Sequence, residues 1–244
     1  MKYKSLNNIV GWVAFAISAF VYLSTIEPTA SWWDCGEYIA TAYKLEIGHP
    51  PGNSMFLMIA RFFTLFAPSI AKIPVMVNSM SALCSAFTIL FLFWTITIFA
   101  RKLFPQDREL TMSEKLVIMG SGLVGSLGYC FTDSFWFSAV EGEVYAMSAF
   151  FTAIVIWVVM KWDVNADRKD SVKWIILVAY LMGLSIGVHL LNLLTIPALT
   201  YVFYFRKYKP EWQVWILYAL QPISYTLAFV TKILKIKQRP QSRI

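Results

Sequence analysis

Hydrophobic positions along the chain form long uninterrupted runs that are separated by short polar loops. Runs close to the length of a membrane-spanning helix, which needs about 20 apolar residues, cover 8–25, 75–100, 116–129, 144–160 and 212–230. The apolar sequence between Trp174 and Phe205 is too long for one helix and has basic residues on both sides. It therefore predicts a helical hairpin that turns at 187–194. Together, these patterns predict an all-α bundle of about seven transmembrane helices.

Two shorter helical patterns lie between the first two predicted spans. The stretch Trp33–Ile47 is amphipathic and stops at Gly48, just before two prolines, which is a helix termination signal. The stretch Asn53–Phe66 is apolar but too short to cross a bilayer. It therefore predicts a helix that lies along the membrane surface.

Charged residues predict the orientation of these helices. Basic residues gather in the segments 2–4, 101–115, 161–173 and 206–209, which is the positive-inside pattern and places the N-terminus inside. The basic residues after position 231 depart from this pattern if the last run spans the membrane. Half of the 14 acidic residues fall on the opposite, outer side: Glu27, Asp34, Glu37, Glu46, Asp133, Glu141 and Glu143.

The composition excludes several classes of protein. Of the 244 residues, 58% are hydrophobic and only 14% are charged, whereas soluble domains carry about 25% charged residues. The net charge of +7 comes from residues in short loops, so no nucleic-acid partner is expected. The three cysteines have no metal-ligand spacing. The sequence GSGLVG at 120–125 lies inside an apolar run with no strand before it, which favours close helix packing over dinucleotide binding.

Candidate catalytic chemistry is concentrated in the stretch WWDCGEYIATAYKLEIGHPPG. Asp34 and Glu37 are three residues apart, so they share one face of a helix. One carboxylate can act as a general base on an acceptor hydroxyl while the other tunes its pKa. The structural alternative is a helix cap, formed either by Asp34 with Glu37 or by Ser31 with Asp34.

Two cationic side chains accompany this acidic pair. His49 precedes a Pro-Pro-Gly turn, where its ring can bind a phosphate or orient a carboxylate. The alternative is a structural turn with a solvated histidine. Arg61 is one of the few basic residues expected on the outer side and is a candidate substrate-binding residue.

Two further polar groups are expected on the same side. Glu141, Glu143 and Tyr145 stand at the entry to the run 144–160, where they either complete a polar substrate site or interact with the helix dipole. His189 and Asn192 lie at the turn of the predicted hairpin. The sequence leaves two interpretations of His189 and Asn192 open: a polar contact between helices, or a contact with a lipid phosphate.

Three stretches of the chain resemble one known family: WWDCGEYIATAYKLEIGHPPGNSMF, SFWFSAVEGEVYAMSAFF and GLSIGVHLLNLLTIPAL. That family of bacterial multi-pass membrane proteins, formerly of unknown function, is related to a eukaryotic protein O-mannosyltransferase and belongs to the GT-C glycosyltransferase superfamily. The resemblance implies a GT-C-like bundle in which 26–73 forms an outer catalytic loop with two juxtamembrane helices. It matches Asp34 to the catalytic aspartate, Glu37 to the nearby acid, and Glu143 and Tyr145 to the second outer loop.

The resemblance also implies an activity. The expected enzyme transfers a sugar such as mannose from a polyprenyl-phosphate donor to an acceptor hydroxyl, on protein Ser/Thr or a glycan, without a cofactor. A divalent metal is possible but not indicated. The expected location is the bacterial inner (cytoplasmic) membrane with the active face outside, and membrane lipids are further partners. The chain, 1–244, is expected to be a single transmembrane domain that lacks the C-terminal outer domain of its relatives.

Two functions from other classes stay open at this point. The first is a transporter or flippase for lipid-linked sugars, which predicts ionisable residues near mid-membrane and paired halves with broken helices. The acids instead cluster on one side of the predicted bundle. The second is an inactive, truncated membrane scaffold.

Overall fold

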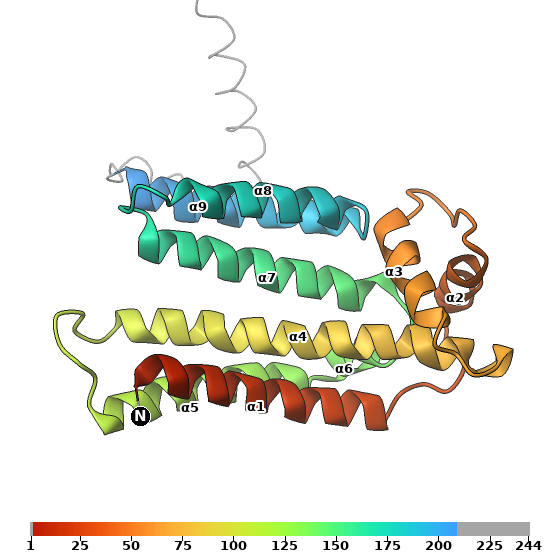
Figure 1. The fold of residues 1–244 in the computed structure, drawn as a ribbon, viewed down its shortest axis with the longest axis horizontal. Helices are drawn as coiled ribbons and strands as arrows, with labels where there is room; N and C mark the ends of the chain where they lie inside the picture. Colours follow the sequence, from red (N-terminus) through yellow and green to blue (C-terminus); the bar gives the residue numbers. More distant parts are fainter. Residues whose placement is uncertain (1, 209–244) are drawn as a thin grey trace, which may run out of the picture. The chain divides into compact units, whose positions relative to one another are not determined.

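The computed structural model describes residues 2–208, and every element in this part of the chain is helical (Figure 1). The chain divides into two compact units, Met1–Ile196 and Pro197–Ile244. The helix α9 (Thr195–Lys207) lies almost entirely in the second unit. The first unit contains α1 (Tyr3–Ser24), α2 (Cys35–Lys44), α3 (Ser54–Thr64), η1 (Ile70–Lys72), α4 (Ile73–Lys102), α5 (Met112–Cys130), α6 (Asp133–Ala139), α7 (Val144–Asn165), α8 (Val172–Ile186) and η2 (Leu190–Leu194).

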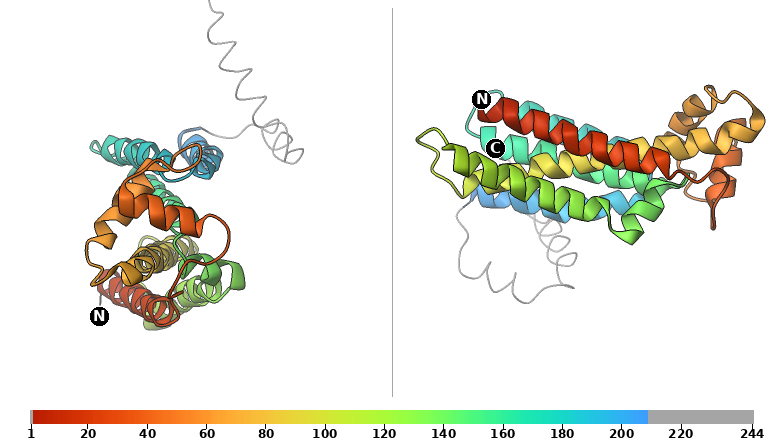
Figure 2. Two further views of the ribbon diagram at one scale, coloured as in Figure 1. Left: turned by 90° about the vertical axis from the view of Figure 1, so that its right-hand side faces the viewer. Right: turned by 90° about the horizontal axis from the view of Figure 1, so that it is seen from below.

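The long helix α4 forms the centre of the first unit. It packs against α1, α5 and α7, and Figures 1 and 2 show these helices running side by side. Small residues allow the close approach. A Cβ atom at Gly122 of α5 would lie 2.7 Å from the side chains of Phe93 and Thr97, and one at Gly11 of α1 would lie 2.6 Å from Trp94. The glycine-rich stretch at 120–125 is therefore a helix-packing surface, as the sequence predicts.

The membrane character of the protein is supported by helix length and hydropathy. Within the described residues, α1, the segment Ile70–Lys102 and α7 are long and apolar enough to span a bilayer. The bent pair α5 and α6, which meet at 70°, provides a fourth span if the two count as one. The protein is thus an integral membrane protein with three or four candidate spans in this part of the chain.

The predicted total of seven spans stays a prediction. The hairpin expected between Trp174 and Phe205 corresponds to α8, η2 and α9, and α8 is among the apolar helices shorter than a full span. The run 212–230 lies outside the described residues. The chain does break at 187–194, where η2 separates α8 from α9, as expected for the turn.

The two short helices α2 and α3 lie at one end of the bundle (Figure 1). Their apolar faces join one core with α4 and α7: Tyr38, Ile39, Ala42, Phe56, Leu57, Ala60, Val77, Met80, Met147 and Phe151. The start of α3 is fixed by α8, since the Gly187 carbonyl accepts the Met55 N–H at 2.8 Å. A Cβ atom at Gly187 would lie 2.9 Å from the Met55 Cβ, so this contact requires glycine. The two predicted helices exist, although α2 begins only at Cys35.

Candidate functional site

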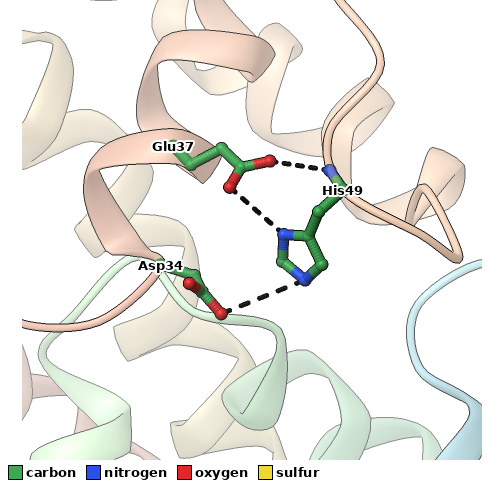
Figure 3. A group of neighbouring side chains, drawn as sticks. All are labelled: Asp34, Glu37 and His49. Atoms are coloured by element: carbon green, nitrogen blue, oxygen red, sulfur yellow. Dashed lines mark hydrogen bonds and ion pairs between the residues drawn. The ribbon is translucent and has the colours of Figure 1, made fainter.

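Asp34, Glu37 and His49 form a cluster at the α2–α3 end of the bundle (Figure 3). The His49 ring lies between the two carboxylates, with Nδ1 3.2 Å from Glu37 Oε2 and Nε2 3.9 Å from Asp34 Oδ2. The His49 backbone N–H also donates to Glu37 Oε1 at 2.7 Å. All three side chains are exposed. We call these three residues the acid–histidine cluster.

The backbone around α2 explains why these side chains meet. Asp34 immediately precedes α2 and Glu37 lies in its first turn, so the two carboxylates share one side of the helix. The helix ends at Lys44. The next residue, Leu45, has a left-handed conformation (φ 56°) that reverses the chain, which then brings His49 back to the start of α2. The turn passes close to Glu37, because a Cβ atom at Gly48 would lie 3.2 Å from Glu37 Oε1.

A second set of contacts holds the turn against α2. Asn53 is buried and donates to the Tyr38 hydroxyl at 2.6 Å. The Tyr38 ring in turn lies 5.7 Å from the His49 ring, centroid to centroid. Sequence reasoning missed both residues. The signal available was the position of Asn53 directly after Pro-Pro-Gly, where an amide side chain often stabilises the local backbone.

The two carboxylates of the cluster have different environments. The pKa of Glu37 is lowered, first by the hydrogen bond from the His49 backbone N–H and then by the His49 ring. Asp34 occupies the N-cap position of α2, but its side chain makes no capping hydrogen bond and is 56% exposed. Neither helix-cap alternative is correct, because the Ser31 hydroxyl donates to Glu141 instead.

Glu141 and Glu143 are buried under the loop that carries Asp34, and each is only 5% exposed. The Glu143 carboxylate accepts the backbone N–H groups of Val144 and Asp34. Burial, and after it the neighbouring charges of Glu141 and Asp34, together raise the pKa of Glu143 to about 7. Burial also raises the pKa of Glu141. These acids therefore support the Asp34 loop from within, and the expectation that they complete a polar substrate site stays a prediction.

The same loop is fixed by α4 through a residue that sequence reasoning missed. Asn78 is buried and donates to the backbone carbonyls of Glu27 at 2.7 Å and Thr29 at 3.0 Å. A Cβ atom at Gly142 would lie 2.8 Å from Asn78 Oδ1, so the glycine between the two buried glutamates allows this approach. An asparagine inside the predicted span 75–100 was the available signal, because polar residues in apolar helices are costly unless paired.

Tyr145, His189 and Asn192 form a separate polar group beside the cluster. The rings of Tyr145 and His189 lie 5.6 Å apart, and His189 Nδ1 accepts the Leu191 N–H at the start of η2. Asn192 is buried; its Oδ1 accepts from Ser148 at 2.8 Å and its Nδ2 donates to the Ser185 carbonyl at 3.1 Å. Of the two alternatives for Asn192, the structure favours the interhelical polar contact.

Arg61 does not contact the acid–histidine cluster. Its guanidinium donates to the Tyr43 carbonyl at 2.7 Å and lies 5.4 Å from the centre of the Tyr43 ring. The last turn of α2 presents carbonyls without helical partners, which favour a cation. Arg61 therefore joins α3 to the end of α2.

A cavity of about 620 Å³ opens beside Tyr145. Its lining is mostly apolar and comes from α4, α5, α7 and η2: Thr88, Leu92, Thr95, Gly125, Tyr129, Tyr145, Ser148, Ala149, Thr152, Ala153, Ile156, Leu191 and Asn192. Thr88 and Thr95 donate their hydroxyls to carbonyls of their own helix, which leaves methyl groups available to the cavity. The acid–histidine cluster and this cavity thus flank the start of α7.

The cluster also has the donor atoms that divalent cations bind. One ligand atom from each of Asp34, Glu37 and His49 lies within 4.8 Å of the others. Two carboxylate oxygens and an imidazole nitrogen suit several metals. The two ring nitrogens of His49 already face the carboxylates, with Nδ1 at hydrogen-bond distance from Glu37 and Nε2 at the longer distance of 3.9 Å from Asp34.

Comparison with known proteins places the chain in a family. The family model "Protein O-mannosyl-transferase TMEM260 N-terminal domain" matches residues 34–212, a segment that begins at Asp34 and includes every side chain of the acid–histidine cluster. The chain is also 23% identical over 248 residues to protein O-mannosyl-transferase tmem260 of Dictyostelium discoideum, covering 95% of this chain and 28% of that protein. It is 23% identical over 172 residues to mouse TMEM260, covering 70% of this chain and 22% of that protein.

These matches span only a quarter or so of each relative's length. No solved structure matches the chain. The family model nevertheless covers most of the sequence, including both short helices, the buried glutamates and the segment from His189 to Asn192. The chain therefore belongs to the family of protein O-mannosyl-transferase TMEM260 N-terminal domains.

Proposed function

We propose that this protein is a GT-C-type glycosyltransferase that moves a sugar, with mannose as the first candidate, from a polyprenyl-phosphate donor to a hydroxyl of an acceptor protein or glycan. The observation that carries the proposal is the acid–histidine cluster on a supported loop in a chain of the O-mannosyl-transferase TMEM260 family. A polyprenyl phosphate is a good leaving group. The chemistry therefore needs a base, a phosphate-binding group and orientation of the two substrates.

Asp34 is the best candidate for the general base. A base must be ionised, exposed and able to reach the acceptor hydroxyl. Glu37 is held by two hydrogen bonds from His49, and Glu143 is buried. Asp34 lacks a capping bond and is 56% exposed. The buried glutamates act as positioning residues, since Glu143 accepts the Asp34 N–H.

The donor has two chemically different parts, and two features of the protein suit them. His49 of the acid–histidine cluster and His189, whose ring lies 5.6 Å from that of Tyr145, are the imidazole groups proposed to bind the donor phosphate. The apolar cavity of about 620 Å³ beside Tyr145 suits a stretch of polyprenyl chain. In this arrangement the phosphate lies at the α2–α3 end of the bundle and the lipid extends between α4, α5 and α7.

The proposed active side is the outer face of the bacterial inner membrane. Support comes from the positive-inside pattern, which assigns the basic end of α4 and the basic segment 161–173 to the inside. The α2–α3 end, where the acid–histidine cluster lies, is the opposite end of α4 (Figure 1).

The test compares membranes that contain the wild-type chain, Asp34→Asn or Glu46→Gln. Glu46 is the matched control, because it is an exposed acid of the same segment that forms an ion pair with Lys44 at 3.8 Å. Transfer of radiolabelled mannose from polyprenyl-phosphate mannose to a Ser/Thr-containing acceptor is measured at equal expression. Asp34→Asn keeps the size of the side chain but removes its basicity, so transfer falls by roughly 10²–10⁴-fold, whereas Glu46→Gln transfers like wild type.

Three outcomes contradict the proposal. Near-normal transfer by well-expressed Asp34→Asn removes the base assignment. Absence of transfer by the wild type, together with movement of the labelled donor across vesicle membranes, identifies a lipid-linked-sugar transporter instead. Absence of both transfer and movement identifies a non-catalytic scaffold.

A further inference from the structure

A second cavity lies at the end of the bundle away from α2 and α3, where α1 and α5 begin and α4 ends (Figure 1). Its volume is about 770 Å³. Three separate segments of the chain line it: Lys2 and Tyr3 at the start of α1, Arg101 at the end of α4, and Arg108, Glu109, Leu110 and Lys115 from the following loop and the first turn of α5. We call it the basic cavity.

The two arginines of the basic cavity are held in place. Arg101 Nη1 donates to the carbonyls of Phe104 at 3.2 Å and Pro105 at 2.8 Å. Arg108 forms a fork with Glu114, at 2.9 Å from Nη1 and 2.5 Å from Nη2. Each guanidinium has five N–H donors, so these contacts occupy only part of its capacity. Holding the side chains in place lowers the entropy lost when an anion binds.

The charge of the basic cavity favours an anion. Lys2, Arg101, Arg108 and Lys115 line it together with a single acid, Glu109. Counting Glu114, the partner of Arg108, still leaves a net positive charge. The positive-inside pattern explains why basic residues lie at this end of the bundle. It does not explain why residues from three segments gather around one hollow.

The surroundings of the basic cavity favour a lipid over a soluble anion. The floor is apolar, because buried Leu110 packs in a core with Phe93, Ile118 and Met119. Continuing along α5 from Lys115, the outward side chains of Leu116, Val117 and Val124 are exposed and apolar. A phospholipid placed here has its phosphate among the cations and its acyl chains along α5.

We infer that the basic cavity binds the phosphate headgroup of an anionic phospholipid, such as phosphatidylglycerol, from the membrane leaflet at this end of the bundle. Basic pockets between transmembrane helices bind anionic headgroups in this way. The bound lipid joins the start of α1, the end of α4 and the start of α5. This site is separate from the acid–histidine cluster and does not depend on the proposed transferase activity.

The test measures lipid binding to the full chain purified in detergent. Native mass spectrometry follows titration with phosphatidylglycerol, with phosphatidylcholine of the same acyl chains, and with glycerol 3-phosphate as a headgroup without chains. The variant Lys2→Gln/Lys115→Gln removes two cations but leaves the arginine contacts to the loop intact. Lys2→Arg/Lys115→Arg keeps the charge. Arg168→Gln/Lys169→Gln is the matched control, because it removes two exposed cations of the 161–173 loop that do not line the basic cavity.

The wild type binds phosphatidylglycerol more tightly than phosphatidylcholine. A basic residue near an anionic lipid contributes about 1 kcal/mol, or about fivefold in affinity. Lys2→Gln/Lys115→Gln therefore binds phosphatidylglycerol roughly 25-fold more weakly, while the arginine variant and the control bind it like wild type.

Three results overturn the inference. Equal binding of the two lipids by the wild type shows that the basic cavity does not select an anionic headgroup, and this comparison needs no variant to fold. An equal loss in the control shows that general surface charge is responsible. Displacement of phosphatidylglycerol by glycerol 3-phosphate at comparable concentration shows a site for soluble phosphates.

Discussion

Glu143 makes the stability of this protein depend on pH, and Glu143→Gln tests that dependence. The side chain is 5% exposed, and burial together with the charges of Glu141 and Asp34 raises its pKa from 4.5 to about 7. A group whose pKa is raised on folding holds its proton more tightly in the folded state. It contributes full stability below pH 4.5, and this contribution is lost as the pH rises through about 7.

The size of the effect follows from the two pKa values. At about 1.4 kcal/mol for each pH unit, the free energy of unfolding falls by about 3 kcal/mol across this window. A change of about 1 kcal/mol shifts the melting temperature of a chain of this size by about 2–4 °C. The Glu143 contribution therefore corresponds to a fall of about 6–12 °C between acidic and mildly alkaline pH.

Thermal unfolding of the detergent-purified protein at pH 5, 6, 7 and 8 measures this fall. Glutamine stays neutral over the whole range, and its carbonyl oxygen still accepts the Asp34 N–H. The melting temperature of Glu143→Gln should therefore change less with pH and exceed that of wild type at pH 8. Glu46→Gln, which removes an exposed acid, should keep the wild-type slope.

One result refutes the reasoning on Glu143. If Glu143→Gln shows the same change of melting temperature with pH as wild type, the buried carboxylate is not the group that titrates. A slope that disappears in Glu46→Gln as well points to a general effect of surface charge.

Three further predictions concern single contacts. Thr111→Ala removes the capping box with Glu114 and should lower the free energy of unfolding by about 1 kcal/mol. Thr132→Ala is the control, because the Thr132 side chain makes no capping hydrogen bond. Equal melting temperatures of the two variants would count against the cap. Asn192→Leu removes the acceptor of the Ser148 and Thr152 hydroxyls and one of the donors to the Ser185 carbonyl, and should cost about 1–2 kcal/mol. An unchanged melting temperature contradicts this. His49→Ala should raise the KM for the donor by roughly tenfold or more with a smaller loss in kcat, and a loss confined to kcat argues against phosphate binding.

The sequence by itself determined the helical character and the local chemistry of the protein. Long apolar runs must satisfy their backbone hydrogen bonds internally, so they predict helices without knowledge of any partner. The two short helices were also predictable from local sequence. An amphipathic pattern that ends before two prolines indicated α2, and an apolar run too short to span a bilayer indicated α3. The spacing of Asp34 and Glu37 placed both carboxylates on one side of α2, since helical geometry alone decides which neighbours share a face.

Only the tertiary structure decided which of these polar side chains are exposed. Asp34 and Glu143 are far apart in the sequence, and no periodicity indicates that the start of α7 lies under the Asp34 loop. Burial there makes Glu143 a support of the Asp34 loop and raises its pKa. Arg61 and Asn192 likewise contact protein groups that come from other helices. A local pattern specifies which face of a helix is polar, but the neighbouring helices determine whether that face meets water, substrate or a buried partner.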